Sequence, residues 1–86
     1  MEAAMIGMLA VSKAGHDKRK IYVITGEDDE YVYLADGRKR TVAAPKKKNK
    51  KHIQIIRKIQ TERPNDGYSD LEIKRTIKMY QEEANV

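Results

Sequence analysis

The sequence predicts a small, mainly β domain of five strands followed by one C-terminal α-helix. Short apolar or alternating segments, separated by turn residues, occupy roughly the first 56 positions, a pattern typical of antiparallel β-domains. The final segment has instead the spacing of an amphipathic helix. The chain has 86 residues and no cysteine, so a single domain with a small core and no disulfide is expected.

Four strands are expected in the first half of the chain, over residues 6–13, 20–26, 31–37 and 38–44. The first alternates imperfectly, which predicts that both of its faces are partly covered. The second and third are rich in β-branched and aromatic residues and are separated by an acidic turn, "EDDE". The "DG" pair at 36–37 predicts a two-residue hairpin into the fourth strand.

The lysine-rich segment 45–51, "PKKKNKK", is expected to be an extended basic loop that binds a polyanion, because like charges at this density repel one another unless a polyanion neutralises them. A solvated loop is the alternative. The next segment, 51–56, suits a fifth strand, although the spacing of Ile55, Ile56 and Ile59 is also compatible with a helix. Because unpaired strand edges promote aggregation, the five strands are expected to close into a small barrel.

The C-terminal helix has the clearest local signals. Ser69 and Glu72 form a capping box, and Tyr68 and Ile73 occupy the positions of a hydrophobic staple. An apolar stripe with helical spacing is formed by Ile73, Ile77, Tyr80 and Ala84. We expect this stripe to pack on the β-domain, and docking of a partner is the alternative. The predicted organisation is a β-domain over 1–56 that includes the basic loop 45–51, a connecting loop over 57–68 and a helix over 69–84.

Positive charge is concentrated in the middle of the chain. Residues 38–63 contain eleven Lys and Arg residues but only one acidic residue, Glu62, whereas the whole chain has a formal net charge of +5. The flanking segments, 1–37 and 64–86, are both acidic on balance. Such a concentrated basic stretch is the expected footprint of polyanion binding, and a solvated charged surface is the alternative.

The segment "IGMLAVSKAGHDKRKIYVITGEDDEYVYLADG", residues 6–37, resembles a KOW motif. In that motif a strand with an early glycine leads through a basic loop with a second glycine into an apolar strand, and Gly7 and Gly15 match these two glycines. The resemblance continues through "PKKKNKKHIQ" to about residue 56. Relatives often have a further glycine where this chain has Arg19, and glycine there would permit a backbone conformation that arginine disfavours.

By these motifs the chain is similar to the short KOW-domain RNA-binding proteins of Gram-positive bacteria. Those proteins resemble the KOW-bearing large-subunit ribosomal protein of archaea and eukaryotes, the fourteenth in its series. The resemblance implies an SH3-like (KOW) barrel that binds structured RNA, often ribosomal RNA of the large subunit, with a role at the ribosome in translation. Ribosomal proteins are further candidate partners. The resemblance also implies that the loop between the first two strands faces the RNA.

Basic side chains are the candidate RNA contacts, because phosphate recognition needs positively charged donors. Some lie in the loop that the resemblance directs at RNA, and others in the lysine-rich segment. Arg38 and Arg40 flank the "DG" turn and could contact phosphates or stack on bases, although charges there could also protect an edge strand. The complete set is Lys13, His16, Lys18, Arg19, Lys20, Arg38, Arg40, Lys46, Lys47, Lys48, Lys50 and Lys51.

Three tyrosines, Tyr22, Tyr31 and Tyr33, have two candidate uses. Because the chain contains no Phe and no Trp, tyrosine must supply the aromatic side chains of the core. Packing in the core is therefore the expected use of these three tyrosines. Stacking on RNA bases is the alternative.

Catalysis is not expected, and neither is a cofactor. The sequence has no recognisable nucleophile motif and no phosphate-cradling glycine loop. His16 and His52 are far apart and no Cys accompanies them, so a metal site is not expected either. The acidic turn lacks the glycine and ligand spacing of a calcium loop.

No membrane partner is expected. The longest apolar run, 3–11, is too short to cross a bilayer and follows Glu2 rather than a basic segment, so it is also a poor signal peptide. The cytoplasm is therefore the default location. A second functional hypothesis remains open: a protein-interaction module that uses the helix stripe or the lysine run to bind an acidic partner.

Overall fold

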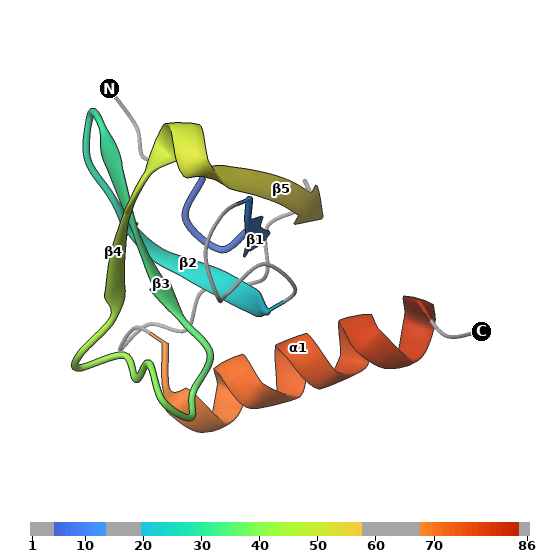
Figure 1. The fold of residues 1–86 in the computed structure, drawn as a ribbon. Helices are drawn as coiled ribbons and strands as arrows, with labels where there is room; N and C mark the ends of the chain where they lie inside the picture. The colour runs from blue at the N-terminus through green and yellow to red at the C-terminus, as the bar shows by residue number, and fades with distance from the viewer. Residues whose placement is uncertain (1–4, 14–19, 58–67, 85–86) are drawn as a thin grey trace.

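Five strands, a short 3₁₀ turn and one α-helix make up the described part of the protein. The computed structural model describes residues 5–13, 20–57 and 68–84, and its elements can be followed along the chain in Figure 1. They are β1 (Leu9–Ser12), β2 (Ile21–Glu27), β3 (Tyr31–Ala35), β4 (Lys46–Asn49), the 3₁₀ turn η1 (Lys50–His52), β5 (Ile53–Arg57) and α1 (Asp70–Ala84). The predicted class, mainly β with a C-terminal helix, is confirmed.

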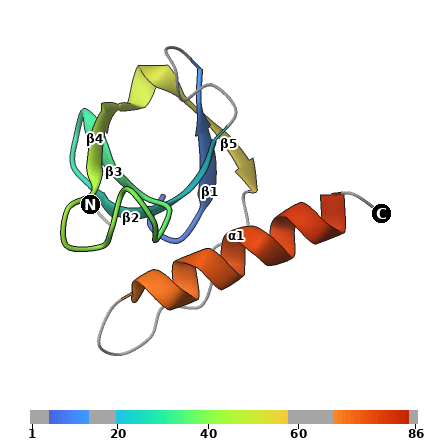
Figure 2. The ribbon, with the colours of Figure 1, turned by 60° about the horizontal axis from the view of Figure 1, so that its bottom comes forward.

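All five strands belong to one antiparallel sheet with the order β4-β3-β2-β1-β5. The first four strands follow one another as a meander, and β5 returns to pair with β1. The sheet is strongly curved, as Figure 2 shows, and η1 connects its two outermost strands along the chain. Among the described residues no pairing joins β4 to β5, so the sheet is open.

Both faces of the sheet contribute buried residues, which gives the small core two halves. The inner half contains Ala10, Tyr22, Ile24, Val32, Leu34 and Ile53. The outer half contains Leu9, Val23 and Ala35 together with Ile73 of α1. Neighbouring residues such as Leu9 and Ala10 therefore enter different halves, which confirms the expectation that both faces of the first strand are covered.

The first two strands differ from their predicted limits because of two glycines. β1 begins at Leu9 rather than at residue 6, since Gly7 adopts a φ of 92° in the turn that precedes the strand. β2 continues past Gly26 to Glu27, and the register shifts between Ile24 and Gly26. Gly26 lies opposite Tyr33, and a Cβ there would come within 3.2 Å of the tyrosine ring, so glycine lets the ring lie across the strand.

The predicted hairpin at 36–37 and its return strand at 38–44 are wrong. β3 ends at Ala35, and a compact turn over 36–40 follows, hereafter the 36–40 turn. The Asp36 Oδ1 accepts hydrogen bonds from the backbone N–H groups of Arg38 (2.8 Å) and Arg40 (3.0 Å). The N–H groups of Asp36 and Gly37 both donate to the Arg40 carbonyl. An aspartate side chain that satisfies two amides stabilises this wider turn in place of a two-residue hairpin.

The expected basic loop over 45–51 is also wrong, because most of it is strand β4 and the turn η1. β4 pairs with β3 from Leu34↔Lys46 to Tyr31↔Asn49. Strand geometry sends successive side chains to opposite faces, so neighbouring lysines of the run are separated rather than crowded. The fifth strand is confirmed over the helical alternative, and it begins at Ile53, after η1.

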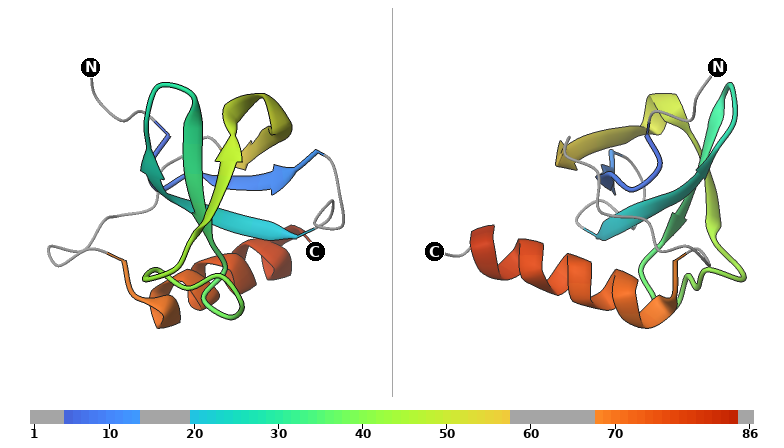
Figure 3. Two further views of the ribbon diagram at one scale, coloured as in Figure 1. Left: turned by 60° about the vertical axis from the view of Figure 1, so that its left-hand side comes forward. Right: turned by 180° about the vertical axis from the view of Figure 1, so that it is seen from behind.

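Helix α1 packs its apolar stripe on the outer face of the sheet. The two views of Figure 3 show the helix lying along one side of the β-domain. Ile73 is buried, and Tyr68, Ile77 and Tyr80 are half-buried around it. The Ser69 half of the capping box is confirmed, because the Glu72 N–H donates to Ser69 Oγ (3.2 Å). The Glu72 carboxylate accepts a hydrogen bond from the Ser69 hydroxyl instead of from a backbone N–H. The side chain of Ala84 and most of the connecting loop, residues 58–67, lie outside the described residues.

Candidate nucleic-acid interface

The loop between β1 and β2, which the KOW resemblance directs at RNA, lies largely outside the described residues. His16, Lys18 and Arg19 belong to that part. The two described basic residues that border the loop, Lys13 and Lys20, are both exposed. Described basic side chains therefore stand on both sides of this loop.

The end of β1 meets the turn η1. The Lys13 N–H donates to the His52 carbonyl at 2.8 Å, so Lys13 lies beside η1. Lys51 and His52 are exposed on that turn. Lys51 and Lys13, which are far apart in the sequence, thus belong to one basic region. His52 is exposed, and it belongs to η1 rather than to the strand expected over 51–56.

The lysines of β4 divide between the two faces of the sheet. Lys46 and Lys48 lie opposite Leu34 and Val32, on the inner face, and both are half-buried. Burial lowers the pKa of Lys46, and the neighbouring charge of Lys48 lowers it further. Lys47 lies on the outer face and is exposed. The sequence alone treats these three lysines as equivalent, whereas in the structure only Lys47 is exposed and lies on the outer face.

Lys47 lies next to two tyrosines on the outer face of β3. Its Nζ is 4.3 Å from the centroid of the Tyr31 ring, which is the geometry of a cation–π contact. Tyr33, opposite Lys47 in the register, donates a hydrogen bond from its hydroxyl to Asp28 Oδ2. Tyr31 and Tyr33 are half-buried, whereas Tyr22 is only 1% exposed and belongs to the core. Burial, with a smaller contribution from Asp36, raises the pKa of Tyr22.

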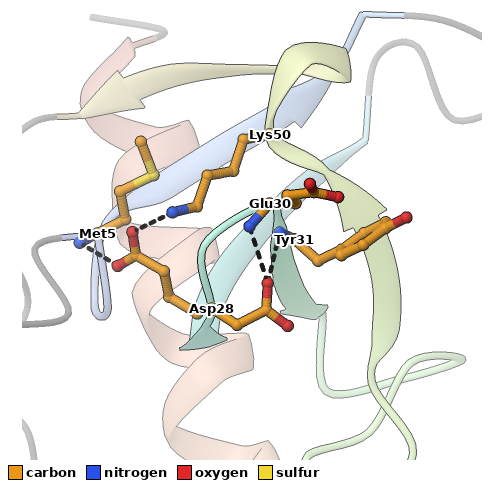
Figure 4. Close-up of polar contacts among 6 residues, drawn as sticks. Met5, Asp28, Glu30, Tyr31 and Lys50 are labelled. Atoms are coloured by element: carbon orange, nitrogen blue, oxygen red, sulfur yellow. Dashed lines mark hydrogen bonds and ion pairs between the residues drawn. The ribbon is translucent and has the colours of Figure 1, made fainter.

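The acidic turn after β2 is built by Asp28. Its Oδ1 accepts hydrogen bonds from the N–H groups of Tyr31 (2.7 Å) and Glu30 (3.0 Å), as Figure 4 shows. These two hydrogen bonds lower the pKa of the Asp28 carboxyl, and the bond from Tyr31 has the larger effect. The exposed turn over 28–30 agrees with the prediction, but Glu27 belongs to β2.

Lys50, a predicted RNA contact, is already paired with an acid. Its Nζ lies 2.8 Å from Glu27 Oε2, while Glu27 Oε1 accepts the Met5 N–H at 2.9 Å; Figure 4 shows Met5 and Lys50 meeting this carboxylate. Burial alone would raise the pKa of Glu27, but the hydrogen bonds from Lys50 and Met5 and the Lys50 charge outweigh it and lower the pKa below 4.5. Because its charge is neutralised, we assign Lys50 to the fold rather than to the interface.

This pairing predicts a pH-dependent contribution to stability. A carboxyl whose pKa is lowered on folding stabilises the fold fully above its unfolded pKa and loses that effect as the pH falls through the folded value. We expect Glu27→Gln to cost about 1–2 kcal/mol of unfolding free energy at pH 7, and this difference from wild type should shrink below pH 4.5. Urea denaturation over pH 3–7 measures it. Glu30→Gln, at an exposed position, is the control. A Glu27→Gln cost that stays constant to pH 3 would contradict the assignment.

A basic concavity lies between α1, the start of β2 and the 36–40 turn, and is hereafter called the basic groove. It has a volume of about 690 Å³. Its lining residues are Lys20, Ile21, Asp36, Arg38, Lys39, Lys74, Arg75, Ile77, Lys78 and Gln81. The structure thus brings together Lys20 and Arg38, two predicted contacts far apart in the sequence. Arg40, the other arginine of the turn, is exposed and does not line the groove.

Four basic residues of the groove escaped the sequence analysis, namely Lys39 and the helical residues Lys74, Arg75 and Lys78. A signal for the helical residues was present in their spacing. Positions three and four residues apart lie on one side of a helix, and these three positions flank the apolar stripe that packs on the sheet. The charge count alone hid them, because the C-terminal segment is acidic on balance.

The sequence matches no protein-family model and no curated protein. Among the described residues, no cluster of His, Cys, Asp and Glu side chains has the composition of a metal site. The helix in the described part of the chain is too short and too polar to span a membrane.

Proposed function

We propose that this chain is an RNA-binding protein with an SH3-like β-domain of the KOW type, as its sequence motifs imply. The strand order supports the fold assignment, because such a barrel requires a meander whose last strand returns to the first. The order β4-β3-β2-β1-β5 meets that requirement, and a 3₁₀ turn between β4 and β5 links the two outermost strands. Curvature of the sheet in Figure 2 is in line with it.

One observation carries the proposal of RNA as the ligand. Lys47 lies over the ring of Tyr31, next to Tyr33, on the outer face of the sheet. An acidic protein would account for exposed lysines, but not for aromatic rings beside them. RNA offers both phosphates for the cations and unpaired bases for the rings. The observation therefore favours RNA over an acidic protein partner.

Basic residues without an acidic partner support a polyanion as the ligand more generally. Lys50 is paired with Glu27. Seven other basic residues form no ion pair within 4.0 Å in the described part of the chain, namely Lys20, Arg38, Lys39, Lys47 and the three basic residues of α1. Cations without carboxylate partners leave their charge available to an external anion.

The proposal is tested by fluorescence anisotropy of a labelled RNA hairpin with an unpaired loop, over a salt series. We expect affinity to fall steeply with salt, because each neutralised phosphate releases counterions. Tyr31→Ala should weaken binding about 5–50-fold through lost stacking, while Tyr31→Phe should retain most of the affinity because the ring remains.

Poly-glutamate of matched length is the control ligand. Equal binding of poly-glutamate and RNA by the wild-type protein, with no effect of Tyr31→Ala on either, would instead support a module for acidic protein partners. No binding of RNA at low salt would overturn the proposal.

We further propose that the RNA is ribosomal RNA of the large subunit, following the family resemblance. Sedimentation of the tagged protein with purified ribosomal subunits on a gradient, over a salt series and with ribonuclease as control, tests this. Migration with the large subunit that fades at high salt is expected. A protein that stays at the top of the gradient at low salt would exclude the ribosome while leaving other RNAs open.

A further inference from the structure

We propose that the basic groove binds the phosphodiester backbone of an RNA strand, so that α1 is part of the RNA-binding surface and not only a packing element. This inference rests on the proposed RNA-binding function and extends it to a part of the chain outside the KOW resemblance. The β-domain alone would then be an incomplete binding unit.

The charge of the groove is strongly one-sided. Six basic residues line it, against one acidic residue, Asp36. The Asp36 Oδ1 already accepts two backbone N–H groups of its own turn. Among the described residues, none of the six cations forms an ion pair within 4.0 Å. Repulsion among unpaired cations gathered in one concavity is relieved when an anionic chain binds there.

The two walls of the groove are fixed against each other. A Cβ at Gly37 would lie 2.4 Å from the Asp70 carbonyl oxygen, so glycine allows the 36–40 turn to approach the first turn of α1. Just beyond, the Val42 N–H donates to Asp70 Oδ1 at 2.8 Å. Arg38 and Lys39 on the turn are thereby held near Lys74 on the helix before any ligand arrives, which reduces the ordering cost of binding.

The composition of the lining also suits a nucleic-acid strand. Ile21 and Ile77, which are half-buried against the core, provide an apolar base beneath the exposed cations. Cations beside an apolar base attract phosphates more strongly than cations surrounded by water. Lys74 and Lys78 are one helical turn apart, about 6 Å along the axis, a spacing comparable to that of neighbouring phosphates in one strand.

The test compares two double variants that change the net charge equally. Lys74→Gln/Lys78→Gln removes two positive charges from the groove. Leu71→Glu/Met79→Glu adds two negative charges at positions of the same helix that are 55% and 61% exposed and do not line the groove. Affinity for the labelled RNA hairpin is measured by anisotropy over a salt series. Circular dichroism checks that each variant keeps its helix.

We expect the groove variant to bind RNA at least about 10-fold more weakly than wild type. The negative slope of log affinity against log salt should become shallower by about 1.5, because two phosphate contacts are lost. The control variant should keep the wild-type slope and lose less than about 3-fold. Equal losses and equal slopes in both variants would overturn the groove assignment. In that case the wild-type protein still binds RNA and the proposed function stands. Failure of the wild-type protein to bind any RNA would overturn both.

Discussion

Replacing Gly37 by alanine should cost at least about 3 kcal/mol of unfolding free energy, the largest effect on stability that we expect from a single added methyl group. Gly37 has a φ of 80°, which alanine disfavours. The new Cβ would also meet the Asp70 carbonyl oxygen at 2.4 Å and Lys74 Cγ at 2.8 Å. Either the 36–40 turn or the first helical turn of α1 must move, and the hydrogen bond from the Val42 N–H to Asp70 would be lost. Urea denaturation followed by circular dichroism measures the effect.

Gly26→Ala is the matched control for this prediction. Its Cβ would lie 3.2 Å from the edge of the Tyr33 ring, a side chain that can shift, and no positive φ applies at this position. We expect a loss of about 1 kcal/mol or less. Similar small losses in both variants would contradict the close approach of the 36–40 turn to α1.

Charge reversal at Lys20 and Arg38 together should weaken RNA binding about 100-fold or more at moderate salt, because each attractive phosphate contact becomes a repulsive one. The two residues come from different parts of the sequence and meet at the basic groove. Both are exposed, so the double variant Lys20→Glu/Arg38→Glu should keep the wild-type fold. Anisotropy with the RNA hairpin measures the affinity, and thermal unfolding checks the fold.

Arg40→Glu/Lys51→Glu is the comparison variant, since it makes the same change in net charge at two other candidate contacts, which are exposed and lie outside the groove. We expect it to weaken binding by about 10-fold or less, through the general field of the protein. Should the two double variants lose affinity equally, net charge rather than the position of Lys20 and Arg38 would govern binding.

Local signals in the sequence predicted most of the secondary structure. The capping box at Ser69 and Glu72 and the apolar stripe after it depend on residues within one or two helical turns, so the helix could be predicted closely. The fifth strand followed from the alternation of Ile53 and Ile55. These features need no knowledge of the rest of the fold.

The errors have a common cause in interactions that a linear pattern does not show. The residues next to Asp36 in the sequence are compatible with a two-residue hairpin. The wider turn forms because the Asp36 side chain accepts hydrogen bonds from the backbone N–H groups of Arg38 and Arg40. The lysines of 46–48 were expected in a loop because their charges were counted without a pairing register. Pairing with β3 separates them and gives two of them half-buried sites.

The candidate site was predicted only in part, for a similar reason. Lys20 and Arg38 were named from local charge, but the groove that joins them depends on how α1 docks. Lys50 was named for its charge, and its partner Glu27 lies far from it in the sequence. Whether a basic residue is free or paired is a property of the tertiary structure.

The pairing of β1 with β5 also has a consequence for how the protein folds as it is synthesised. Ser12 lies opposite Ile53 and Leu9 opposite Arg57, so the N-terminal strand must wait for more than half of the chain before its second neighbour exists. Closing so long a loop slows folding, because entropy is lost before the contacts form. The meander from β1 to β4 can assemble earlier, from neighbours in sequence. During translation, β1 therefore remains a half-paired strand until β5 leaves the exit tunnel, and α1 docks last.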